Sequence, residues 1–409
     1  MSNNIGDYNK CCGCGACFNI CPKNAIIMEE DENGFLYPSI NKQLCINCGL
    51  CKSVCNFNNY KKKETGEYPK VNVACSKEED ILKKSSSGGI FATIAKAIIN
   101  DGGVVYGCAL RKEDDYLKPV HIRIDNNDDL IKIQGSKYVQ SYIGNMYAKV
   151  KEDLNAGKKV LFSGTPCQIA GLKSYLKNTN MDNLFLIDII CHGTPSMKMF
   201  QDYQDFLKKK YKGEIKEFIF RNKENGWNSK GIKGKVTIEQ SRKKEKDVMI
   251  NQHNSAYINL FIETAIQREE CYSCPYASDK REGDITIGDY WGIDKIHPEV
   301  LKENGGKMEL SKGISCLLIN TEKGKRMVEL CKKNMIMYES DFEKVSRKNG
   351  QLLHPCKSRL DREEILKIYR NENYEGLEKW LNKKLGVKKA IYYLWDKLPS
   401  NLKKKVKRH

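Results

Sequence analysis

The chain has 409 residues, of which 40% are hydrophobic and 30% are charged, and this balance indicates a soluble protein of two or three domains. No apolar stretch approaches the roughly 18 residues of a membrane-spanning helix, so integral membrane classes are excluded and a cytoplasmic location is expected. The formal net charge of +18 favours a negatively charged partner, or equally a solvated lysine-rich surface; no helix-turn-helix or finger signature accompanies it, so nucleic acid is not expected.

Residues 1–60 contain two runs of four cysteines, each spaced Cys-x2-Cys-x2-Cys-x3-Cys. This is the spacing of bacterial ferredoxins with two [4Fe–4S] clusters, in which the fourth cysteine of each run ligates the other cluster. The spacing therefore predicts a small ferredoxin-like domain with two clusters, called cluster I and cluster II below. The expected ligands are Cys11, Cys14, Cys17 and Cys55 for cluster I, and Cys21, Cys45, Cys48 and Cys51 for cluster II.

A zinc site or a disulfide framework would account less well for these cysteines. A zinc site needs four ligands, fewer than the duplicated run supplies. A disulfide framework needs an oxidising compartment, and the short polar stretch before Cys11 does not resemble a signal peptide. Cys12 is out of register and is expected to be a spare thiol. The turn Asp31–Gly34 predicts a hairpin between the two cluster loops.

A charged linker is expected over 61–70, and the pattern then alternates between strand and helix. Strands are predicted at 71–75, 104–110, 160–162 and 184–190, and helices at 90–100, 147–154, 166–176 and 195–210. Later strands are predicted at 215–221, 232–238, 285–287 and 314–319, with helices at 255–266 and 322–333. The alternation predicts a mixed-sheet α/β domain over 71–340, in an overall α/β or α+β architecture. A basic, partly helical segment is expected over 341–409.

Four later cysteines form a candidate third cluster site. Cys167 and Cys191 each follow a predicted strand, and the carboxyl ends of strands are where open α/β sheets bind ligands. Cys271 and Cys274 supply a close pair in a Cys-x2-Cys arrangement. Spacing alone does not decide for a cluster, since the pair could be half of a zinc knuckle and Cys167 a redox thiol.

Six short motifs occur together and in order along the chain: Ser85–Gly89, Gln134–Tyr138, Gly164–Gln168, Cys191–Gly193, Cys271–Pro275 and Gly288–Gly292. In this combination the chain resembles the beta subunit of coenzyme F-420 hydrogenase/dehydrogenase over roughly residues 70–335. The resemblance implies an oxidoreductase that contains FAD and iron–sulfur clusters, and it favours the third [4Fe–4S] cluster. The family's name points to a deazaflavin as the substrate. Related bacterial proteins often occur among polysaccharide-biosynthesis functions, where no deazaflavin need be present, so the substrate could also be another small molecule.

Two of these motifs suit a flavin. Ser86, Ser87, Gly88 and Gly89 form a small turn before a predicted helix, where a pyrophosphate could bind; a helix cap with glycines for close packing is the alternative. Gly135, Ser136, Lys137 and Tyr138 offer a backbone donor, a hydroxyl, a cation and an aromatic ring. Lys137 could stabilise a reduced flavin anion, or be an ordinary surface lysine. Thr165 is a further candidate for cofactor binding, His192 could bond to the flavin or a cluster, and Asp289 could orient the Cys271–Cys274 loop.

The expected function is electron transfer between the N-terminal clusters, a third cluster, FAD and an unidentified substrate or redox partner, in an anaerobic setting. An acidic protein such as a ferredoxin is the expected partner, and no catalytic acid or base is assigned. One alternative is an electron-transfer subunit that docks on a larger enzyme without a substrate of its own; another is a flavin-free cluster protein. The aromatic and polybasic stretch over 392–408 suggests a weak membrane-surface contact or a solvated tail.

Overall fold

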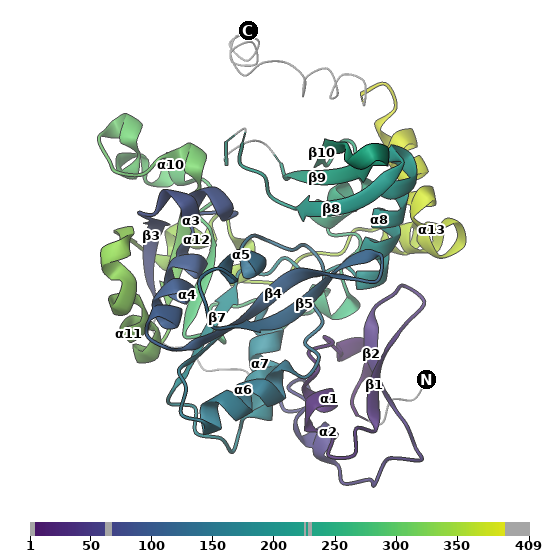
Figure 1. The fold of residues 1–409 in the computed structure, drawn as a ribbon, viewed down its shortest axis with the longest axis horizontal. Coiled ribbons are helices and arrows are strands. Elements are labelled where there is room, and N and C mark those ends of the chain that lie inside the picture. Colours follow the sequence, from purple (N-terminus) through teal and green to yellow (C-terminus); the bar gives the residue numbers. More distant parts are fainter. Residues whose placement is uncertain (1–4, 62–67, 225, 228–230, 389–409) are drawn as a thin grey trace.

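The computed structural model describes residues 5–61, 68–224, 226–227 and 231–388, and it contains an N-terminal hairpin unit, a large mixed sheet and a small antiparallel sheet (Figure 1). The N-terminal unit comprises α1 (Ala16–Ile20), β1 (Ile26–Glu30), β2 (Leu36–Ile40) and α2 (Leu50–Ser53). The predicted hairpin is confirmed, because β1 and β2 pair antiparallel around a turn in which the Asp31 carboxylate accepts from the backbone N–H groups of Asn33 and Phe35.

The large sheet has eight strands in the order β13-β3-β12-β11-β7-β6-β4-β5. Their bounds are β3 (Lys70–Ser76), β4 (Val104–Glu113), β5 (Tyr116–Ile124), β6 (Val160–Gly164), β7 (Leu184–Ile189), β11 (Ile285–Asp289), β12 (Ser315–Ile319) and β13 (Met335–Ser340). The four central strands β4, β6, β7 and β11 are parallel, and the outer strands are antiparallel to their neighbours. The predicted mixed-sheet α/β fold is therefore confirmed.

Helices cover both faces of this sheet, as its central strands require, because parallel strands are buried on both sides. Leu161 of β6 and Phe185 of β7 join one hydrophobic core with residues of α4 and α11, whereas the alternate residue Phe162 joins another core with residues of α6 and α7. The helix bounds are α3 (Glu79–Lys84), α4 (Ile90–Asn100), α5 (Leu130–Ile133), α6 (Met146–Asn155), α7 (Pro166–Tyr175) and α11 (Glu322–Cys331). Cys14 and Cys17 belong to the α6–α7 core, so the N-terminal unit shares a core with that face.

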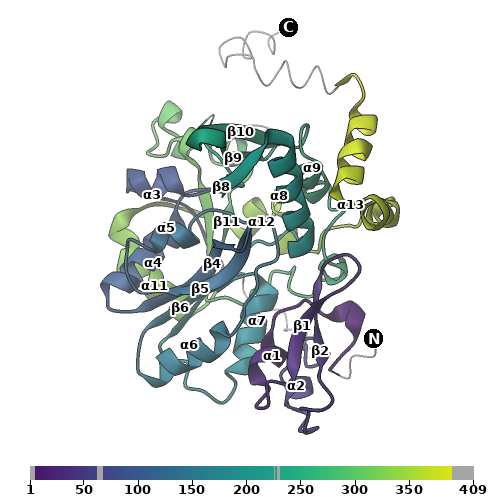
Figure 2. The ribbon, with the colours of Figure 1, turned by 45° about the vertical axis from the view of Figure 1, so that its right-hand side comes forward.

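A third core lies around the small sheet, which has the order β10-β9-β8. Its strands are β8 (Gly213–Ile219), β9 (Lys233–Gln240) and β10 (Glu245–Asn251), and they pack with α8 (Met197–Tyr211), α9 (Ala256–Ile262) and α13 (Arg362–Leu385). The short helices α10 (Ile293–Ile296) and α12 (Phe342–Ser346) border the large sheet. Figure 2 shows α13 next to α8 and α9 and above the β1–β2 hairpin.

Most predicted elements match, and the predicted helix at 90–100 coincides with α4. The strands β5, β10 and β13 were not predicted. Beyond residue 340 the described chain is partly helical, as expected. Most of the expected linker and the whole aromatic and polybasic stretch at 392–408 lie outside the described residues. Among the described helices, none combines the length and the apolar character that crossing a membrane requires.

Candidate iron–sulfur and flavin sites

The expected ligands of cluster I, Cys11, Cys14, Cys17 and Cys55, line one pocket together with Cys12. Gly13 and Gly15 have φ values of 64° and 75°, which glycine adopts without strain, and they turn the backbone around this pocket. Cys14 and Cys17 are each 9% exposed, and burial raises the pKa of the Cys17 thiol. The pocket therefore lies inside the protein, against the face of the sheet that α7 covers.

The expected ligands of cluster II, Cys21, Cys45, Cys48 and Cys51, line a second and more open pocket. Gly49, at φ 74°, precedes α2 and makes the corresponding turn in this loop. Cys48 is exposed, and the other three cysteines are only partly buried. In Figure 1, the loop between β2 and α2 lies at the lower edge of the molecule, away from the large sheet.

A third pocket is lined by Cys167, Cys191, Cys271 and Cys274, the four cysteines that sequence reasoning grouped. Cys167 lies in the first turn of α7, Cys191 follows β7, and the other two come from the 3₁₀ helix Glu269–Tyr272 and the turn after it. His192 and Cys12 also line this pocket. In the part of the chain that the structure describes, no three His, Cys, Asp or Glu side chains are grouped so that they could hold a metal ion. The four thiols surround a pocket.

The surroundings of Cys167 favour its thiolate. A hydrogen bond from the Cys12 thiol is the largest influence, and together with the Thr165 hydroxyl, 3.2 Å from the Cys167 sulfur, it lowers the pKa of Cys167 to about 7. Thr165 also forms a capping box with Gln168 at the start of α7. Thr165 was predicted to bind a cofactor; the structure places it beside the third cysteine pocket and at a helix cap.

Burial acts in the opposite direction on the other three thiols of this pocket. It raises the pKa of Cys271 to about 12, and it also raises the pKa values of Cys191 and Cys274. A cluster is ligated by thiolates, so binding iron here must release protons. The neighbouring Glu270 carboxyl is buried as well, and this raises its pKa to about 7.

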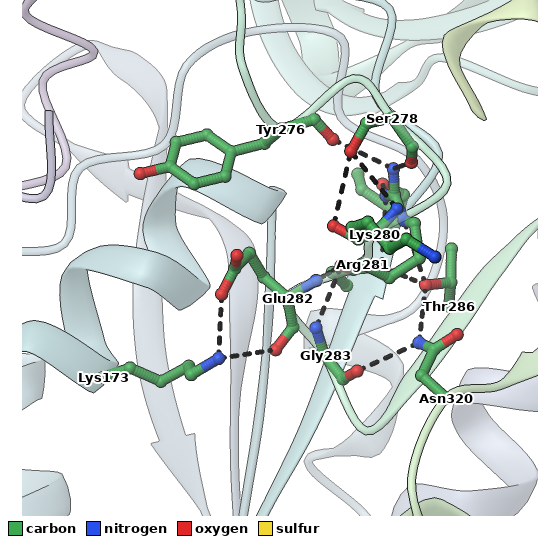
Figure 3. Close-up of polar contacts among 11 residues, drawn as sticks. Lys173, Tyr276, Ser278, Lys280, Arg281, Glu282, Gly283, Thr286 and Asn320 are labelled. Atoms are coloured by element: carbon green, nitrogen blue, oxygen red, sulfur yellow. Dashed lines mark hydrogen bonds and ion pairs between the residues drawn. The ribbon is translucent and has the colours of Figure 1, made fainter. Parts of the chain in front are cut away.

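A buried ion pair between Asp188 and Arg281 supports the Cys271–Cys274 loop. Figure 3 shows Arg281 among Ser278, Gly283 and Thr286. Arg281 donates hydrogen bonds to the carbonyl oxygens of Tyr276 at 3.1 Å and Ser278 at 3.3 Å, both just after Cys274. Asp188, in β7, accepts from the backbone N–H groups of the residues that follow Arg281. The pair therefore links the loop to the strand that leads to Cys191. Sequence reasoning did not identify it, because most of its partners are backbone groups.

Arg268 attaches the N-terminal unit to the rest of the protein. Its side chain is 1% exposed and donates to the carbonyl oxygens of Cys11 at 2.6 Å and Leu36 at 2.9 Å. The guanidinium also lies over the Tyr37 ring, 4.0 Å from its centroid. Arg268 lines the third cysteine pocket as well, so this one residue contacts the surroundings of two cysteine sites.

Cys12 occupies the wall between the cluster I pocket and the third cysteine pocket, because it lines both. Its carbonyl oxygen accepts from the Gln140 side chain at 2.9 Å. On the same boundary, the Asn56 amide donates to the Cys167 carbonyl at 3.1 Å. The spare thiol of the sequence analysis thus has a defined place between the two sites.

The two predicted flavin motifs lie side by side, because the Ser86 hydroxyl accepts from the Ser136 backbone N–H at 2.7 Å. Other groups of the first motif serve packing. Ser87 donates to the Ile314 carbonyl at 3.0 Å, and the Gly88 N–H donates to the Ser315 hydroxyl at 2.9 Å. A side chain at Gly88 would place its Cβ 2.6 Å from the Ala74 carbonyl oxygen. Close packing therefore explains Gly88. The motif ends at Gly89, which precedes α4 with φ 78° and no side-chain cap.

Lys137 is partly buried and donates to the Gln134 carbonyl at 2.6 Å, and its burial lowers its pKa to about 8. A second lysine, Lys223, donates to the Ser87 carbonyl at 2.9 Å, and burial lowers its pKa to about 8 as well. Sequence reasoning missed Lys223, which lies between predicted elements. The two flavin motifs therefore have two partly desolvated amines beside them.

The remaining candidates occupy positions around these motifs. Tyr138 stacks on Phe261 at 4.7 Å between ring centroids, and His192 meets the same ring edge-on at 5.8 Å. Asp289 accepts from the Trp227 indole at 2.8 Å and pairs with Arg221 at 3.2 Å. These bonds join Asp289 to the segment after β8, whereas the sequence analysis gave it a role in orienting the Cys271–Cys274 loop.

Three family descriptions of known proteins match the chain. The family descriptions that match are the N-terminal part of the coenzyme F420 hydrogenase/dehydrogenase beta subunit over residues 71–147, its C-terminus over residues 157–345, and a 4Fe-4S dicluster domain over residues 10–59. The two beta-subunit matches together span more than half of the chain.

Similar proteins include two from Methanocaldococcus jannaschii and one from Methanosarcina barkeri. The F420-dependent formate dehydrogenase subunit beta of Methanocaldococcus jannaschii is 23% identical over 312 residues, 74% of this chain and 70% of the relative. An uncharacterized ferredoxin of the same organism is 43% identical over 54 residues, 13% of this chain and 69% of the relative. A solved F420-reducing [NiFe] hydrogenase complex from Methanosarcina barkeri matches with a TM-score of 0.42 and 18% identity, covering 78% of this chain and 92% of that chain. The chain therefore belongs to the family of coenzyme F420 hydrogenase/dehydrogenase beta subunits and carries a 4Fe-4S dicluster domain before the family's own two parts.

Proposed function

We propose that the protein is an iron–sulfur flavoprotein that passes electrons between clusters I and II, a third [4Fe–4S] cluster and FAD. The observation that carries the proposal is the third cysteine pocket, which four thiols from three separate segments of the chain line together. Cys12 lines this pocket and the cluster I pocket, so the two sites are immediate neighbours. Cluster II lies on the outer side, and the three sites together form a chain of electron carriers.

The two flavin motifs are compatible with FAD. The N-terminus of α4 has no side-chain cap and could receive a pyrophosphate, with Lys137 and Lys223 as nearby cations. Bound FAD would supply the exchange between one-electron and two-electron chemistry. Burial lowers the pKa of Lys137 to about 8, so the amine is still mostly protonated at pH 7. In that charged form Lys137 would favour a negatively charged reduced ring beside it. Tyr138 and Phe261 provide an aromatic wall next to Lys137.

The substrate of this oxidoreductase would be a deazaflavin or another small two-electron carrier. One relative is named as a subunit of an F420-dependent formate dehydrogenase, which supports the deazaflavin. The alternative that the sequence raised, a reaction linked to polysaccharide biosynthesis, would use the same clusters with another acceptor.

Anaerobic purification followed by iron, sulfide and flavin analysis tests the proposal. We expect about twelve iron atoms per chain, for three cubes, and about one FAD. Cys274→Ala should reduce the iron content to about eight, whereas Cys331→Ala, a buried thiol of α11 that donates to the Met327 carbonyl, should leave twelve. Lys137→Met should weaken flavin binding or lower the flavin potential without changing the iron content. A protein with about eight iron atoms and no flavin would contradict the proposal.

A second candidate function is that of an electron-transfer subunit without a substrate of its own. The relative named as a beta subunit of a formate dehydrogenase favours it. Reduction of F420 by the purified chain, with dithionite as the electron source, separates the two. Turnover by the isolated chain supports the enzyme, and turnover that requires an added catalytic subunit supports the docking subunit.

A further inference from the structure

The two N-terminal cluster pockets of the proposed electron path differ in their access to solvent. Cys14 and Cys17 of the cluster I pocket are buried, whereas Cys48 of the cluster II pocket is exposed. Cys14 and Cys17 belong to the core that α6 and α7 form, whereas Cys21 and Cys51 of the cluster II pocket are only partly buried against that core. Electrons from another protein therefore have a direct approach to the cluster II side.

The loop around cluster II carries an exposed apolar group. Leu44, Ile46 and Leu50 are 50%, 57% and 41% exposed, and they lie within seven consecutive residues. Single exposed apolar residues need no explanation, but a compact group on a redox loop is typical of a surface that another protein covers. We call Leu44, Ile46 and Leu50 the apolar tip.

Lysines surround the apolar tip. Lys23, Lys42 and Lys52 are exposed and line the cluster II pocket. The two segments that contain them, 21–25 and 41–53, have no Asp or Glu. Apart from the thiolates that would ligate a cluster, the charged side chains at this end of the N-terminal unit are therefore positive at neutral pH.

Carboxylates gather at the other end of the same pocket, near the β1–β2 turn, and several are paired. Arg370 lies 3.3 Å from Glu32 and also pairs with Glu363, and Arg362 lies 2.8 Å from Glu269. Figure 2 shows this hairpin end close to α13, while α2 lies at the opposite end of the unit. The positive and negative ends of the surface are thus separate.

From these observations we infer that the apolar tip and its three lysines are the docking surface for an acidic electron-carrier protein, which exchanges single electrons with cluster II. The inference rests on the proposed function, since it needs a cluster at this loop. Opposite charges would steer the carrier toward the tip, and the apolar contact would exclude water between the two cofactors. One electron leaves the reduced carrier and enters the oxidised cluster, with no bond formed or broken.

Stopped-flow reduction of the anaerobically purified full chain by a reduced, acidic dicluster ferredoxin tests the inference. The test variant is the triple substitution Lys23→Glu, Lys42→Glu and Lys52→Glu. The control is Lys295→Glu, Lys325→Glu and Lys332→Glu, which reverses the same charge at exposed positions on and near α10 and α11. At low ionic strength we expect the test variant to slow the bimolecular rate about 10- to 100-fold and the control to stay within about twofold of the wild type.

Three further measurements make the result specific. The wild-type rate should fall as salt increases, and the test variant should lose this dependence. Ile46→Ala should slow the reaction severalfold without altering the salt dependence. Dithionite, a small reductant, should reduce all variants equally. Two results would overturn the docking surface. One is a wild-type chain whose clusters are reduced by dithionite but not by ferredoxin, and the other is equal slowing of the reaction with ferredoxin in both triple variants. A wild-type chain without reducible clusters would instead overturn the proposed function.

Discussion

The two cysteine runs have the same spacing, yet the fold gives them different surroundings. Cys14 and Cys17 of the first run are each 9% exposed, whereas Cys48 of the second run is open to solvent. Gly171 of α7 approaches Cys14 so closely that an added Cβ would lie 2.9 Å from its sulfur. The spacing of a run therefore determines which cofactor it can bind. The burial of its cysteines determines whether that cofactor would lie near the protein core or near solvent.

Removing one expected cysteine ligand from each run should show the largest difference between the two cluster sites. Cys48→Ala should lower the iron content from about twelve to about eight atoms, because only cluster II loses a ligand. Cys14→Ala should lower it further, because Cys12 lines both the cluster I pocket and the third cysteine pocket, so loss of cluster I should disturb the neighbouring site as well. Iron analysis with EPR of the reduced protein checks both, and equal losses in the two variants would contradict the difference in role.

Arg268→Met should cost roughly 3–4 kcal/mol of unfolding free energy, because it leaves buried carbonyl oxygens of the N-terminal unit without a donor. Denaturant unfolding monitors the stability, and limited proteolysis should show residues 1–60 becoming accessible. Arg347→Met is the control, since Arg347 makes only an exposed ion pair with Glu343, and it should cost less than about 1 kcal/mol. A similar cost for both would mean that Arg268 does not hold the unit in place.

Gly171→Ala should cost roughly 1–3 kcal/mol, because the new methyl group would press α7 against Cys14 in a packed core. Cluster I should also become less stable to chelators, while cluster II should be unaffected. Gly350→Ala provides the comparison, since its Cβ would meet only the His354 ring, at 3.3 Å. Thermal unfolding and iron release with a chelator measure the two effects; faster loss of cluster II would count against the packing argument.

Ile46→Ala should have the smallest effect on stability, within about 0.5 kcal/mol, because the side chain is 57% exposed. Ile26→Ala, in the same unit but 3% exposed, should cost roughly 2–4 kcal/mol. Denaturant unfolding of both variants checks the contrast. A large cost at Ile46 would show that the apolar tip serves the fold of the unit itself.

Local patterns in the sequence were sufficient for most elements of the fold. The apolar face of α4 and the glycines after it predicted the helix Ile90–Asn100 as observed. The strand β5 was missed because Pro119 interrupts its pattern, and the structure places β5 at the sheet edge, where proline is tolerated. The four cysteines that line the third pocket could be grouped from the sequence, because cysteines at strand ends and in a close pair carry their own signal.

Other parts of the site could not be predicted, because they depend on contacts between distant segments. Arg268 and Arg281 bind mainly backbone carbonyl groups, which any sequence possesses, so neither arginine is distinguished from the many others. The place of Cys12 between two pockets likewise depends on how the N-terminal unit lies against α7. The Ser86–Gly89 motif precedes a helix, as predicted. Its composition did not indicate that Ser87 and Gly88 form hydrogen bonds to the segment at Ile314 and Ser315.

The Arg268 contact has a consequence for kinetics. An electron carrier on a loose tether must search for its acceptor, and its transfer rate then depends on tether length and solvent viscosity. Here the Cys11 carbonyl and the Tyr37 ring are fixed on a buried guanidinium, so the N-terminal unit stays beside the third cysteine pocket. Electron transfer within the chain would then be a first-order step that neither dilution nor added glycerol slows.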